Sequence, residues 1–233
     1  MKTRKIMIIS LMMIFSMVVL SSNALAGRAD VVSFGADLTL KQQEQILEQF
    51  GVSEDEVDII MVTIEDVKDH LSGVATDKQI GTKAISSAYV KLLSQGEGLE
   101  VHTHNITLIT KEMYANAMVT AGVEDAQVVV TAPFNVTGTT ALTGIMKAFE
   151  EASGKKLTEK AKKVANEELL LTGEMGEKIG KDDATKLMQA VKERVIRQKI
   201  KTPEDIREVI LDIASQLDIK LSEDQINQIL KLM

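Results

Sequence analysis

Between residues 27 and 152, apolar positions alternate between the spacing of strands and that of helices. Runs rich in β-branched residues predict strands, and the triple valine of the last predicts an interior strand ended by Pro133. Apolar residues three and four apart predict helices between the strands. The predicted strands are 31–34, 58–64 (a buried strand), 99–110 (one bent strand or two) and 127–132, and the predicted helices are 39–50, 65–71, 78–94, 110–121 and 140–152.

After Gly154 the helical spacing continues alone, and each predicted helix begins at a capping residue. The helices start at Thr158, at Asp182 or Asp183, at Thr202 with proline next, and at Ser222, whereas glycines at 173, 176 and 180 predict a loop. The expected fold class is α/β (α+β), a small mixed sheet with flanking helices followed by an all-helical C-terminal region. The expected domains are 27–152 and 153–233.

Residues 1–26 have the pattern of an export signal. Basic residues at positions 2, 4 and 5 precede an apolar run over 6–20, and the segment ends in Ala24-Leu25-Ala26. The run is shorter than the roughly 20 residues of a spanning helix, although an uncleaved anchor is the alternative. We expect cleavage after Ala26 and a secreted or extracytoplasmic protein with no further transmembrane segment.

Charge and composition narrow the range of partners. The mature chain has 24 basic and 34 acidic side chains, a net charge of −10, and residues 27–152 carry −11 of it. An acidic surface repels nucleic acid at long range, and only six aromatic residues remain for stacking on bases. Without cysteine the mature chain has no disulfide and no lipidated cysteine. Nucleic acid is therefore not an expected partner.

A His-Thr-His sequence is the sharpest candidate for a metal site. On a strand, His102 and His104 point to one face, and Glu100 lies on the same face as a third ligand. Short motifs of this kind also arise by chance. The more ordinary interpretation is a partly exposed strand with both imidazoles in solvent and Val101 inside, so we expect no metal or other cofactor.

The loop over residues 133–140 is a candidate anion site. It leads into a predicted helix, whose free N–H groups and dipole favour an anion. Gly138 would permit close approach, and Thr139 and Thr140 would add hydroxyl donors. The Gly-Lys-Ser/Thr ending of a phosphate loop is missing. An ordinary capped connection, with Thr139 or Thr140 as N-cap, is the favoured interpretation.

Other catalytic patterns are weak. The chain has no G-x-S-x-G sequence, and Ser86 and Ser87 fall inside the predicted helix 78–94. Most carboxylate pairs stand at helix starts, where they complement the dipole. Arg194, Arg197 and Lys201 form a basic stripe, which is typical of the wet face of an amphipathic helix.

Ordered blocks of small residues run through the middle of the chain, among them Ile80-Gly81-Thr82, Ser86-Ser87-Ala88-Tyr89 and the run from Val136 to Gly144. In these blocks the sequence resembles the YpuA-like family of exported bacterial proteins, a domain of unknown function. The resemblance implies export and a shared fold, and it implies no reaction. We therefore expect an exported, soluble, non-enzymatic module that binds an unknown protein or a cell-envelope component. The alternative is an extracellular enzyme, metal-assisted through His102 and His104 or anion-binding at 133–140.

Overall fold

The computed structural model of the chain describes residues 30–71, 73, 75, 76 and 80–233, so the expected export signal lies outside the described residues. Five strands form one mixed sheet in the order β2-β1-β3-β5-β4. All of them run parallel except β3, which lies antiparallel between β1 and β5. The strands are β1 (Asp30–Gly35), β2 (Val57–Val62), β3 (Ser87–Leu92), β4 (Leu99–Ile106) and β5 (Ala126–Val136).

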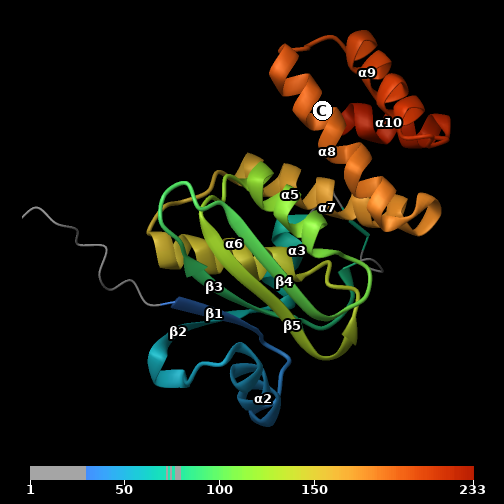
Figure 1. The fold of residues 1–233 in the computed structure, drawn as a ribbon. Coiled ribbons are helices and arrows are strands. Elements are labelled where there is room, and N and C mark those ends of the chain that lie inside the picture. The colour runs from blue at the N-terminus through green and yellow to red at the C-terminus, as the bar shows by residue number, and fades with distance from the viewer. Residues whose placement is uncertain (1–29, 72, 74, 77–79) are drawn as a thin grey trace, which may run out of the picture.

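Helices cover both faces of this sheet, as Figure 1 shows. On one face, Ile46 of α2 (Leu40–Phe50) packs with Val32 and Phe34 of β1. On the other face, helices α5 and α6 pack against Val31 and Val128 in the largest core cluster. The predicted α/β fold is thereby confirmed. The helices of this second face are α3 (Ile64–Leu71), α5 (Lys111–Ala121), α6 (Ala141–Ser153) and the first half of α7 (Glu159–Ile179).

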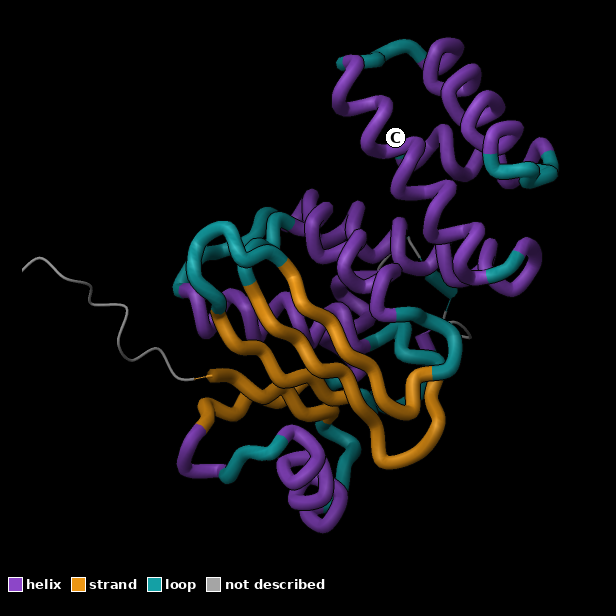
Figure 2. The backbone as a smooth tube through the Cα atoms, viewed as in Figure 1, coloured by secondary structure: helices purple, strands orange, loops and turns teal. Residues whose placement is uncertain are grey.

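The helical region follows to one side of the sheet (Figures 1 and 2). Helices α8 (Lys181–Gln198), α9 (Pro203–Gln216) and α10 (Glu223–Leu232) bury a second core with Met175 of α7. Helix α7 also contributes Leu169 to the core of the sheet, so it belongs to both parts. The boundary at residue 152 stays a prediction. Among the described residues, no helix is long and apolar enough to cross a bilayer.

Capping signals located most helix starts, because a cap bond is made between residues three apart in the sequence. Thr39 accepts from the backbone N–H of Gln42, and the Gln42 side chain accepts from the Thr39 N–H, a complete capping box. A second box, Ser53 with Glu56, opens a short 3₁₀ turn, η1 (Glu54–Glu56). The expected side-chain caps of four further helices are also formed, at Thr110, Thr158, Thr202 and Ser222.

The predicted helix 78–94 is wrong, because residues 87–92 form the central strand β3. Residues 77–79 lie outside the described part of the chain. Ala88, Tyr89 and Val90 pair with both β1 and β5. Apolar residues spaced as in a helix misled the prediction. Ala88 and Val90 are wholly buried, and tertiary packing here outweighs the local preference for helix.

Two strand predictions need correction. Strand β2 is an edge strand with Met61 exposed, so it is not buried on both sides. Pro133 does not end β5, which continues to Val136. It is tolerated because β3 has already ended opposite Thr131 and because the β4 ladder is interrupted between His104 and Ile106.

Two expectations about helices are also wrong. The glycines at 173 and 176 lie inside α7, where an added Cβ at Gly173 would stand 2.8 Å from Ile109 Cδ1. They permit close packing. Helix α8 begins after Gly180 with no side-chain cap, so neither Asp182 nor Asp183 is its N-cap.

Candidate functional site

The candidate metal ligands lie on β4, an edge strand of the sheet. His102 and His104 are exposed and stand opposite Val129 and Thr131 of β5, while Val101 between them is buried. His102 Nε2 donates to Glu100 Oε1 at 2.9 Å, and Gln127 donates to the other oxygen of the same carboxylate at 3.1 Å. These hydrogen bonds lower the pKa of Glu100.

Glu100 therefore already serves as the hydrogen-bond acceptor for its two neighbours. Over the described residues, no group of three His, Cys, Asp or Glu side chains could hold a metal ion. His102 would have to exchange its bond to Glu100 for a metal, and both groups are open to solvent. The metal site at His102 and His104 stays a prediction without added support from this geometry.

The candidate anion loop joins β5 to α6, whose N-terminus lies in the protein interior. Thr140 occupies the N-cap position, but its side chain makes no cap bond. Its hydroxyl instead lies 3.0 Å from the hydroxyl of Ser86, 54 residues earlier. Thr143, in the first turn of α6, is fully buried, and its hydroxyl has no partner among the described residues. The structure thus joins two of the small-residue blocks at one helix start.

Gly138 is surrounded by protein side chains. It has a φ of +89°, and an added Cβ would stand 2.4 Å from Ile106 Cγ2 and 2.5 Å from the Tyr114 hydroxyl. Tyr114 is fully buried and donates to the Gly138 carbonyl. Thr139 is buried as well. The close approach that this glycine permits is made by Ile106 and Tyr114. An anion site at Gly138, Thr139 and Thr140 remains a prediction.

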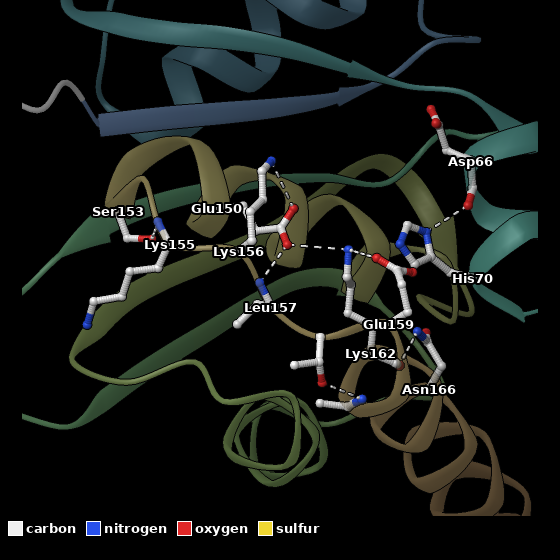
Figure 3. Close-up of polar contacts among 12 residues, drawn as sticks. Asp66, His70, Glu150, Ser153, Lys155, Lys156, Leu157, Glu159, Lys162 and Asn166 are labelled. Atoms are coloured by element: carbon white, nitrogen blue, oxygen red, sulfur yellow. Dashed lines mark hydrogen bonds and ion pairs between the residues drawn. The ribbon is translucent and has the colours of Figure 1, made fainter.

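A cluster of charged groups that the sequence did not predict joins α6 to α7 (Figure 3). Glu150, 8% exposed, accepts from the backbone N–H of Leu157 at 2.7 Å and pairs with Lys162 at 3.3 Å. Lys162 also pairs with Glu159 at 2.7 Å. Burial opposes the charged ammonium, but the two carboxylates outweigh it and raise the pKa of Lys162. The lysine is held as a cation.

Beside this cluster, His70 Nδ1 donates to the carbonyl of Asp66 within α3 at 2.8 Å, as Figure 3 also shows. The Asp66 carboxylate caps that helix through Thr63 and pairs with Lys147 of α6 at 2.7 Å. Burial opposes ionisation here, but hydrogen bonds from Lys147 and Thr63 lower the pKa of Asp66. These groups connect α3 to α6.

A third network fastens α8 to α5 and α7. Lys192 donates to Glu168 Oε1 at 2.7 Å, to the Thr120 hydroxyl at 2.8 Å and to the Asn116 carbonyl at 2.9 Å. Glu168 is 2% exposed and also accepts from Thr120. Here a lysine ammonium fills a cage of three oxygens. In the sequence, the available signal was a charge on the apolar face of a helix, as with Glu168 beside Ala165 and Leu169.

The predicted basic stripe divides into paired and free members. Arg194 pairs with Asp212 of α9 and donates to Gln216. Arg197 and Lys201 are exposed at the turn between α8 and α9. The stripe therefore does not act as one patch.

Comparison with known proteins gives relatives without an assigned activity. Residues 34–233 match a family described as "Protein of unknown function (DUF1002)". The chain is 41% identical over 203 residues to a protein of Bacillus subtilis (strain 168) named "Uncharacterized protein YpuA", a match that covers 87% of this chain and 70% of the relative. No solved structure matches the chain.

Proposed function

The chain belongs to this family of proteins of unknown function, DUF1002, and from that premise we propose that it is an exported, non-enzymatic binding module that acts on a partner outside the cytoplasm. The proposed partner is a protein or another component of the cell envelope. Its export is inferred from the basic, apolar and small-residue order of residues 1–26.

The observation that carries the non-enzymatic part is the engagement of the ionisable side chains. Glu100 is bonded to His102 and Gln127, Glu150 to Leu157 and Lys162, and Glu168 to Lys192 and Thr120. Each of these groups holds neighbouring strands, helices or loops together. Removing any of them for chemistry would break a structural contact.

The direction of the pKa shifts supports the same conclusion. A carboxylic acid that donates a proton near neutral pH needs a raised pKa. Hydrogen bonds from His102 and Lys162 lower the pKa values of Glu100 and Glu159, respectively. The pKa of Asp66 is likewise lowered, with bonds from Lys147 outweighing burial. These carboxylates are suited to structural ion pairs and hydrogen bonds.

Metal analysis tests the rival enzymatic function. Mature protein, residues 27–233, would be incubated with zinc, dialysed and analysed for bound metal, together with His102→Ala and His104→Ala. His70→Ala is the matched control, because His70 lies on α3 and bonds only within that helix. We expect no stoichiometric zinc in any of the four proteins. Stoichiometric zinc that the β4 variants lose and His70→Ala keeps would contradict the proposal.

Site-specific photo-crosslinking in exporting cells tests the binding part. The crosslinker replaces one exposed apolar residue at a time, because exposed apolar side chains are where partners gain most from contact. We expect a discrete adduct at a subset of positions. Absence of any adduct at all six would contradict a binding role. The positions are Leu40, Met61, Val119, Phe134, Ile196 and Leu211.

A further inference from the structure

Two surfaces at opposite ends of the helical region complement each other. We propose that the protein associates head to tail, with the turn between α8 and α9 of one copy docking into a groove beside the turn between α9 and α10 of a second copy. The inference depends neither on export nor on the absence of catalysis.

The groove lies between the end of α9 and the segment that leads into α10. Leu211, Ala214 and Ile219 give it an apolar floor, and its volume is 290 Å³. Leu211 is 45% exposed, which is unusual for a leucine in a helix that otherwise packs its apolar side chains into a core. A second hollow of 390 Å³ shares Ile219 and adds the carboxylates of Asp183 and Asp218. The groove is thus apolar with an acidic border.

The complementary surface is the tip, which we define as Ile196, Arg197, Lys199 and Lys201. Ile196 is 69% exposed, and the three cations are exposed around it. In the described part of the chain, none of these cations pairs with a carboxylate. An aliphatic side chain surrounded by positive charge matches an apolar groove with carboxylates at its border.

The tip also carries two acidic residues, Glu204 and Asp205, in the first turn of α9. They complement the remaining charge of the groove, because Lys220 lines both hollows. The signs of the charges on the two surfaces can therefore be matched in one orientation, which fixes the direction of docking.

A chain cannot place its tip in its own groove. Asp183 stands in the first turn of α8 and Ile196 in its last turn, so about 20 Å of helix separates them at 1.5 Å per residue. In Figure 1 the turn between α8 and α9 lies at the far end of the helical region from the sheet. The occupant that this chain supplies is therefore a second copy, in a heterologous contact that leaves one tip and one groove free.

A single docked turn buries little surface, so we expect weak association that grows with protein concentration and weakens with salt. Sedimentation velocity of mature protein, residues 27–233, over a wide concentration range measures it. The tip variant is Ile196→Glu with Arg197→Glu. The groove variant is Leu211→Glu with Asp218→Asn, since asparagine tolerates the positive φ of 55° at position 218.

Each variant alone should remain a monomer at concentrations where the unmodified protein forms dimers and longer species. Their mixture is the decisive sample, because the tip variant keeps an intact groove and the groove variant an intact tip. We expect a 1:1 dimer that grows no further. Leu40→Glu, at a 77% exposed position on α2, is the matched control and should associate like the unmodified protein.

Three results would overturn the inference: an unmodified protein that stays monomeric at every concentration, variants that associate as it does, or a mixture that remains monomeric. Circular dichroism and melting of each variant verify folding, and the formation of the mixed dimer itself requires both variants to be folded. A failure here leaves the metal and crosslinking tests of the proposed function unaffected.

Discussion

Replacing Gly138 with alanine separates two reasons for having glycine in the loop before α6. The first is backbone conformation, because φ at this position is +89°. The second is space, because the new Cβ would stand 2.4 Å from Ile106 Cγ2, where carbon atoms ordinarily pack 3.5–4.0 Å apart. Gly96→Ala is the matched control, since its φ is +91° and an added Cβ there would have nothing within 4 Å.

The control should lose about 1 kcal/mol of unfolding free energy, because an L-residue in a left-handed conformation costs about 1–2 kcal/mol and a stiffer unfolded chain offsets part of that. Gly138→Ala should lose about 2–4 kcal/mol, because overpacking adds about 1–3 kcal/mol. Tyr114 cannot move away cheaply, since it is fully buried and bonded to the Gly138 carbonyl.

Urea unfolding of the two variants and the unmodified protein, followed by circular dichroism, gives both free energies from one experiment. A shift in midpoint without a change in slope would attribute each loss to the folded state. Equal losses in the two variants would refute the packing argument and reopen the loop as a place where a ligand approaches the backbone.

Three further changes test other contacts. Lys192→Met should destabilise the protein by about 3–5 kcal/mol, because Glu168 is left buried without its cation, and Lys192→Met with Glu168→Met should recover most of that in urea unfolding; additive losses would contradict the network. Asp66→Asn should be less stable than the unmodified protein at pH 7, by at most about 1 kcal/mol for this partly exposed pair. Because the folded pKa of Asp66 is lowered from 3.8, that stability is lost as the pH falls through the folded value, so the gap should close in acid; a gap independent of pH would contradict it. Gly173→Ala should lower the melting temperature despite alanine's better helix propensity, because its Cβ would meet Ile109 at 2.8 Å; a raised melting temperature would show that the helix interface can relax.

Local signals predicted the starts of helices better than their extents. The bonds at Thr39, Thr110 and Ser222 join residues three apart, so the sequence contains both partners within one window. The end of α7 could not be predicted in that way. Gly173 and Gly176 look like helix breakers, and their role depends on Ile109 and Met113, which are more than 60 residues away in the sequence.

Strand β3 shows the same limit for the sheet. Its serines and alanine have little intrinsic preference for a strand, and the residues that hold it, on β1 and β5, lie more than 35 residues away on either side. Small side chains at this place also let α6 approach the sheet, where an added Cβ at Gly144 would stand 2.7 Å from Ser33 Oγ. A window of 15 residues contains none of these contacts.

For the candidate sites, spacing predicted which residues share a face but not what each one contacts. The alternation on β4 does place Glu100 and His102 together, and they bond to each other. Thr140 stands at the predicted N-cap position, yet its hydroxyl turns to Ser86, which the sequence analysis placed in a helix. The ion pairs of Glu150 and Glu168 depend on how helices pack and could not be predicted from the sequence.

The claim on which the proposed function depends is that the chain works outside the cytoplasm without its first 26 residues. Intact-mass analysis of the protein recovered from cells expressing the full sequence, in envelope, medium and cytosolic fractions, measures this directly. The account predicts a polypeptide that begins at Gly27 in the envelope or the medium. A folded protein that retains Met1 and stays in the cytosol would contradict it.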